Sequence, residues 1–250
     1  MLSQGPTRGL PSYLTTQVKN NSELRDIMFD YSDASKFAHI QAHLGHDRLT
    51  HYMTATAGDI RRAIALYVWN TTVSAAFYGS LQALEVGLRN GMHVALSNSY
   101  GATWHDNQSF LALDSTGGLS KDIQDAKDEL LGRNQVQDTP HIVAQLHFGF
   151  WTQLTSSRFE TDLWLPCLQA AFANYILVEG RPLRRNVVAR NLIRIRMLRN
   201  RIAHHERIFH YDLQLRYEEI LSVCAWMYDD LRDWIEHHFS IRTNLSQRPC

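Results

Sequence analysis

The sequence predicts an all-α fold, and three observations support this prediction. Apolar residues recur at intervals of three and four through most of the chain, whereas strand-like alternation and hairpin dipeptides are scarce. One segment, residues 59–101, keeps the helical spacing without interruption. Another, residues 211–239, carries apolar side chains in strict heptad spacing, which is typical of helix-on-helix packing. We therefore expect a bundle with long central antiparallel helices and additional helices around them.

The longest expected helix begins near Asp59, a favourable N-cap residue, and ends at Gly101. Several of its faces are apolar, so it should lie centrally, and its length allows for a break or a kink. The segment 104–118 should be a loop with short helical pieces. Further helices are expected at about 119–131, 139–157, 160–179, 183–204 and 211–239, with Pro166 kinking the third of these or marking its start.

The chain of 250 residues is 44% hydrophobic and can bury a sizeable core. We expect a flexible lead at 1–12, which is rich in Gly and Pro, a single helical domain at 13–242 and a flexible tail at 243–250. The three widely spaced cysteines argue against a disulfide framework or a Cys-based zinc site, and they fit a reducing cytoplasm. Neither a signal peptide nor a membrane span is expected, because no apolar run is suitable.

Charge is distributed unevenly along a chain whose formal net charge is zero. Residues 101–180 carry ten acidic and four basic side chains, whereas residues 181–207 carry nine Arg and one Glu. This asymmetry indicates a local anionic partner. Arg presents a planar fork that matches phosphate oxygens.

Two residues of opposite charge, Glu85 and Arg199, fall on otherwise apolar helix faces. Burying an unpaired charge costs several kcal/mol, so each needs a partner or must line a cavity. The simplest hypothesis is that they pair across two helices. The pair could be purely structural, or each side chain could lie at the edge of its face and reach water.

The densest polar cluster is LRNRIAHHERIFH, residues 198–210, which holds Arg199, Asn200, His204 and His205. Metal-free cleavage of RNA needs a base, an acid and a cation beside the phosphate. His can act as base or acid near neutral pH, Arg can hold two phosphate oxygens, and Asn can position either group. In a continuous helix Arg199 and His204 would lie roughly 140° apart around the axis. Their convergence requires a helix end, a kink or the same motif from a second subunit.

At this point the sequence resembles a family. The segment RNRIAH, residues 199–204, matches the R-x4-H signature of the HEPN superfamily. Its continuation HHERIFH, the upstream segment LQALEVGLRN (residues 81–90) and HFGFW (residues 147–151) are similar to segments of Abi-like (abortive infection) proteins.

This resemblance implies a HEPN-like helical bundle and a homodimer in which two copies of the motif face one cleft. It implies a metal-independent endoribonuclease of the toxin or phage-defence type, with no cofactor and with an antitoxin protein as a candidate partner. Family roles fall on Arg199, Asn200 and His204 as catalytic residues and on Glu85 as an orienting or structural partner. The 2′-hydroxyl would attack the adjacent phosphate, with His204 as base or acid. The complementary acid would be His204 of the other subunit, or His205.

Other residues have competing interpretations. Arg194, Arg201 and Arg207 are candidate RNA-backbone contacts or a solvated face. Arg89 and Asn90 belong to RNGMH, residues 89–93, a shorter echo of the motif that is either a second phosphate contact or a packing feature.

The aromatic residues Phe148, Phe150 and Trp151 could stack on bases, although core packing is the simpler interpretation. Histidines at 204, 205 and 210 suggest a zincin only superficially, because the required i, i+4 spacing is missing. The main alternative function is a non-catalytic helical RNA- or protein-binding module in a defence or toxin–antitoxin system.

Overall fold

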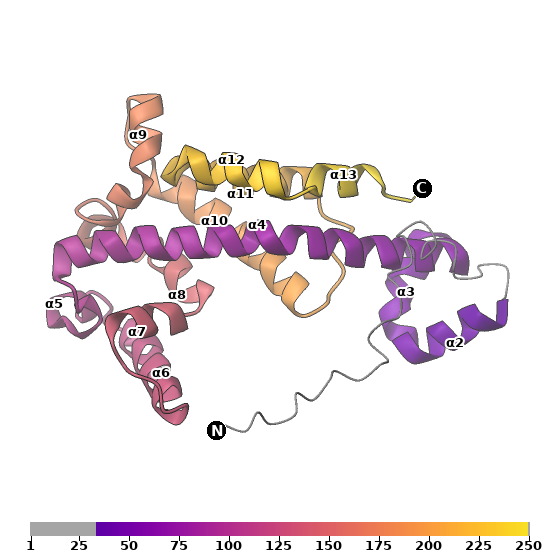
Figure 1. The fold of residues 1–250 in the computed structure, drawn as a ribbon, viewed down its shortest axis with the longest axis horizontal. Helices are drawn as coiled ribbons and strands as arrows, with labels where there is room; N and C mark the ends of the chain where they lie inside the picture. The colour runs from indigo at the N-terminus through magenta and orange to yellow at the C-terminus, as the bar shows by residue number, and fades with distance from the viewer. Residues whose placement is uncertain (1–33, 250) are drawn as a thin grey trace, which may run out of the picture. The chain divides into compact units, whose positions relative to one another are not determined.

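The computed structural model describes residues 34–249, and this part of the chain is helical and contains no strand. Contacts divide the chain into two compact units, Met1–Arg61 and Arg62–Cys250, of which the structure describes residues 34–61 and 62–249. The predicted lead at 1–12 lies outside the described residues. The described part of the first unit holds α2 (Ala34–Leu44) and α3 (His46–Ala55) (Figure 1).

The predicted long helix is confirmed as α4 (Ile60–Tyr100), which is continuous over 41 residues. The Asp59 carboxylate accepts a hydrogen bond from the backbone N–H of Arg61, as expected for an N-cap residue. Gly101, with φ of 92°, follows the last turn. Apolar side chains on several faces are buried, as predicted for a central helix.

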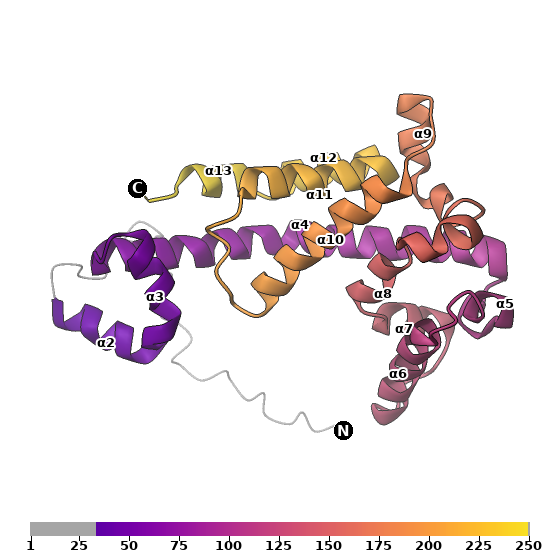
Figure 2. The same cartoon turned by 180° about the vertical axis from the view of Figure 1, so that it is seen from behind.

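The C-terminal part of the chain packs against α4 (Figures 1 and 2). It consists of α10 (Arg185–Ala203), α11 (Leu213–Met227), α12 (Asp229–His238) and α13 (Ile241–Ser246). The rings of Phe77 on α4 and Tyr217 on α11 meet edge to face with centroids 6.3 Å apart. A Cβ atom at Gly79 would lie 2.2 Å from the ring of Phe239, so this position of α4 admits no side chain.

The structure differs from two expectations for this part. The single helix expected at 211–239 divides at Tyr228, whose backbone is extended (φ −151°, ψ 121°). The flexible tail expected from residue 243 is helical as far as Ser246, and the indole of Trp69 donates a 2.8 Å hydrogen bond to the carbonyl of Asn244.

The middle of the chain is broken into shorter pieces than predicted. The expected loop is confirmed as η2 (Trp104–Asp106) and α5 (Gln108–Leu111), and the next helix as α6 (Gly118–Gly132). The helix expected at 139–157 is instead α7 (Thr139–Gln145), α8 (Phe148–Gln153) and η3 (Ser157–Phe159). The helix expected at 160–179 is η4 (Glu160–Trp164), η5 (Leu168–Phe172) and α9 (Ala173–Glu179), with a break at Pro166, which has no N–H to donate.

The aromatic residues of HFGFW belong to the core. Phe148, Phe150 and Trp151 are exposed by 5%, 0% and 1%, and Trp104 contacts the last two rings. Core packing, rather than base stacking, therefore accounts for these three residues. No helix within residues 34–249 is both long and apolar enough to cross a membrane.

Candidate functional site

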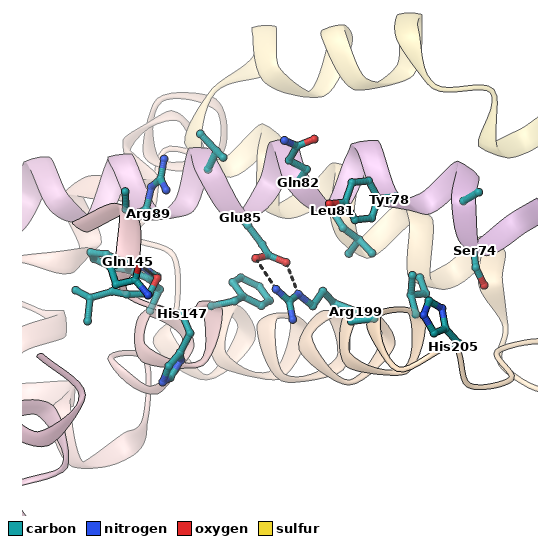
Figure 3. A pocket seen from close by; sticks show the side chains of 18 of the residues that line it. Ser74, Tyr78, Leu81, Gln82, Glu85, Arg89, Gln145, His147, Arg199 and His205 are labelled. Atoms are coloured by element: carbon teal, nitrogen blue, oxygen red, sulfur yellow. Dashed lines mark hydrogen bonds and ion pairs between the residues drawn. The ribbon is translucent and has the colours of Figure 1, made fainter. Parts of the chain in front are cut away.

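A groove of about 850 Å³ lies between α4, the α7–α8 segment and the C-terminal half of α10 (Figure 3). Its charged and imidazole side chains come from segments that are far apart in the sequence: Glu85, Arg89, His147, Arg199 and His205. The groove also has apolar walls, formed by Leu81, Val86, Leu146, Phe148, Trp151 and Ile202 among others.

Glu85 and Arg199 form an ion pair across the groove, which confirms the predicted pairing. Arg199 Nε donates to Glu85 Oε1 at 2.7 Å, and Nη2 lies 3.5 Å from Oε2. The two side chains are 24% and 39% exposed, so they are neither fully buried nor free in solvent. A guanidinium has five N–H donors, so these two bonds leave donors for a bound anion.

The helix α10 ends close to the predicted catalytic cluster. Ala203 is its last residue, the N–H of His205 donates to the carbonyl of Ile202, and the N–H of Glu206 donates to the carbonyl of Arg201. These two bonds form a Schellman motif, in which the turning residue has a left-handed backbone and is usually Gly. Here that residue is His205, with φ of 55°, a conformation that costs a side chain of this kind roughly 1–2 kcal/mol.

The helix end separates the two histidines. His205 lines the groove that Arg199 also lines, whereas His204 is exposed and lies outside the lining. Asn200 is likewise exposed and outside the lining. The groove therefore gathers Glu85, Arg199 and His205, but it does not gather Asn200 or His204 of the same chain.

The chain that follows His205 is fixed to α4 by a buried side chain, Asn70. Its Oδ1 accepts hydrogen bonds from the backbone N–H groups of Ile208 at 2.8 Å and Phe209 at 3.1 Å. Asn70 is 5% exposed and Ile208 is fully buried. Sequence reasoning missed Asn70, although an amide inside the apolar stretch of α4 was a signal.

Two of the other predicted RNA contacts, Arg194 and Arg201, have intramolecular ion-pair partners. Arg194 Nη1 lies 2.9 Å from Glu219 Oε1, and Arg201 Nη1 lies 3.2 Å from Glu206 Oε2. The carbonyl of Arg207 accepts a 3.4 Å bond from Arg201. These pairs hold Arg194 and Arg201 in place within the fold.

The RNGMH segment does not form a second polar cluster. Arg89 lines the groove, and its Nε donates to the exposed Asn90 at 3.3 Å. His93 lies elsewhere on α4, where its Nδ1 accepts a 2.9 Å hydrogen bond from the indole N–H of Trp104. Burial lowers the pKa of His93 and also that of His105, which is 3% exposed.

These two shifts predict a loss of stability in acid. Both histidines titrate near pH 6.5 in the unfolded chain and at lower pH in the folded protein, so the unfolded state binds more protons as the pH falls through 6.5. The melting temperature should therefore fall between pH 7.5 and pH 5. A His93→Gln variant offers Trp104 an acceptor that does not titrate. Its melting temperature should therefore fall less than that of the wild type over the same pH interval. An identical pH dependence of the two proteins would contradict this role for His93.

Sequence reasoning also missed His147, which caps α8. Its Nδ1 accepts a 2.9 Å hydrogen bond from the backbone N–H of Phe150, so the proton of the neutral ring lies on Nε2. Nε2 is 3.8 Å from Asp122 Oδ1. In Figure 3 the ring lies at the Gln145 end of the groove and points away from the Glu85–Arg199 pair. His147 is thus at the edge of the groove and not beside Arg199.

No group of three or more His, Cys, Asp or Glu side chains within residues 34–249 is arranged to hold a metal ion. Comparisons of the chain with family models, with curated proteins and with solved structures find no match.

Proposed function

We propose that the chain is a metal-independent endoribonuclease of the HEPN type and that the groove is its active site. One observation carries the proposal: Arg199, oriented by Glu85, lines the same groove as His205. A fixed cation and an imidazole that line one groove are a minimal set for stabilising and cleaving a phosphodiester.

In the proposed reaction the ribose 2′-oxygen forms a bond to phosphorus and the bond from phosphorus to the 5′-oxygen breaks. One imidazole takes the proton of the 2′-hydroxyl, and an imidazolium gives a proton to the leaving 5′-oxygen. The guanidinium of Arg199 donates its remaining N–H groups to the charged phosphorane. The products are a 2′,3′-cyclic phosphate and a 5′-hydroxyl.

His205 supplies one of the two imidazoles in this scheme. The other is His204 of a second copy of the chain, which makes the proposed enzyme a homodimer. Two properties of His204 support this assignment: it is exposed at the end of α10, and it lies outside the groove of its own chain. A symmetric dimer would place each His204 against the groove of the other chain in the same way.

The resemblance to Abi-like proteins also supports a proposal for the biological role of the enzyme. Degradation of host or phage RNA in the cytoplasm would arrest growth, and an antitoxin protein would restrain the enzyme. The second candidate function is RNA binding without chemistry. It is favoured by the position of Asn200 and His204 outside the groove.

Cleavage of RNA in the presence of EDTA tests the proposal. The full chain should cut RNA without added metal, and Arg199→Ala should lower the rate by about 10²–10³-fold, as expected for the loss of a preorganised cation. Arg190→Ala is the matched control, because Arg190 is an exposed Arg on the same helix outside the groove. Strict dependence on a metal ion, or an Arg199→Ala variant with the wild-type rate, would contradict the proposal. Binding of RNA without cleavage would favour the second candidate.

A further inference from the structure

A tyrosine in the groove has a large exposed surface. Tyr78 is 66% exposed and belongs to the groove lining. Within residues 34–249 its hydroxyl makes no hydrogen bond and its ring contacts no other aromatic ring. An exposed aromatic side chain inside a groove presents a stacking surface to whatever binds there.

Tyr78 lies close to the proposed reaction centre. It precedes Glu85 by seven residues, so both side chains are on nearly the same face of α4, about 10 Å apart along the axis. Arg199 and His205 contribute to the site from the end of α10. In Figure 3 Tyr78 lies between these two residues along the length of the groove. A phosphate held by Arg199 would therefore place a neighbouring nucleotide beside this ring.

The surroundings of Tyr78 suit a nucleobase. Leu81 is buried one turn further along α4, and Ala75 and Ile202 also line this part of the groove. The charged groups of the lining are Glu85, which is neutralised by its partner, and the cations Arg199 and Arg89. An apolar wall with an aromatic face, adjoining a phosphate-binding cation, matches the two chemical halves of a nucleotide.

We propose that Tyr78 forms a base-binding subsite, in which its ring stacks on the base of the nucleotide next to the phosphate held by Arg199. This inference depends on the proposed function of the groove. Stacking requires an accessible base face, so the nucleotide at this position must be unpaired. The subsite contributes to substrate binding and not to the chemical step, because Tyr78 supplies neither the transferred proton nor the phosphate-binding cation.

The test measures binding and catalysis separately in the full chain. Binding is followed by the fluorescence of a 2′-O-methyl oligoribonucleotide containing 2-aminopurine, which the proposed reaction cannot cleave. Tyr78→Ala should weaken binding about tenfold, whereas Tyr78→Phe, which keeps the ring, should bind as the wild type does. With a cleavable RNA, Tyr78→Ala should raise KM and leave kcat nearly unchanged. Val94→Ala is the matched control, because Val94 is an exposed apolar residue of α4 outside the groove.

The outcomes distinguish this inference from the proposed function. If the wild type cuts RNA and Tyr78→Ala binds the oligonucleotide equally well, the base subsite is wrong and the ribonuclease proposal stands. If Tyr78→Ala lowers the mass measured by sedimentation, Tyr78 belongs to a contact between two copies of the chain and the inference is overturned. If the wild type neither binds nor cuts RNA, the proposed function fails and the subsite fails with it.

Discussion

A His205→Asn variant is expected to lose RNA cleavage by about 10²–10⁴-fold, the usual contribution of a positioned acid or base. His205 is the histidine at the end of α10 that lines the groove with Arg199. Asn tolerates the left-handed backbone at this position, where φ is 55°, so the variant removes the imidazole without adding strain. Initial rates of cleavage measure the loss, and the melting temperature shows that the fold is kept.

His204→Ala tests the second imidazole of the proposed dimer. Each variant alone should be inactive, but mixing His204→Ala with His205→Asn should restore cleavage. About a quarter of the wild-type rate is expected, because half of the randomly formed dimers are mixed and each mixed dimer has one intact site of two. Wild-type activity of His204→Ala, or no recovery on mixing, would show that His204 of a second copy does not complete the site.

The second large effect is expected at Asn70. In Asn70→Ala the backbone N–H groups of Ile208 and Phe209 lose their common acceptor in a buried environment. Each unpaired buried donor costs about 1–3 kcal/mol, so for the two donors the free energy of unfolding should fall by about 2–6 kcal/mol. Urea denaturation measures the change.

Asn90→Ala is the matched control for this prediction, because Asn90 is an exposed Asn of the same helix. It should change the free energy of unfolding by less than about 0.5 kcal/mol. Cleavage by Asn70→Ala should also fall at temperatures where the protein stays folded, since the bond fixes the segment that begins three residues after His205. Equal stability of Asn70→Ala and the wild type would contradict the role of this amide.

The elements that sequence predicted best are those set by local pattern and by the cost of burying charge. The continuous helix α4 follows from uninterrupted apolar spacing and from Asp59 at its start. The ion pair of Glu85 and Arg199 follows from two opposite charges on apolar faces, each of which needed a partner.

The breaks in the helices could not be predicted in the same way. The heptad spacing of residues 211–239 continues through Tyr228, although the backbone is extended there, because side-chain spacing does not encode a single residue's dihedral angles. The interruption before α8 depends on the cap formed by His147, a residue type that is not favoured at this position.

The candidate site was predicted in its parts but not in its arrangement. The sequence indicated a helix end between Arg199 and His204 as one route to convergence, and α10 does end at Ala203. Which histidine reaches the groove depends on the left-handed backbone of His205, where a glycine would be the usual signal. Asn70 was missed because its partners lie 138 and 139 residues away in the sequence.

The most direct test of the central claim, that the groove cleaves RNA by 2′-hydroxyl attack at a phosphate held by Arg199, is mass spectrometry of the products formed in EDTA. A short RNA is compared with the same RNA carrying a single 2′-deoxy nucleotide before the cleaved bond. We predict a 2′,3′-cyclic phosphate and a 5′-hydroxyl from the RNA, no cut at the deoxy position, and almost no product with Arg199→Ala. Products with a 5′-phosphate, or cleavage after the deoxy nucleotide, would contradict the claim.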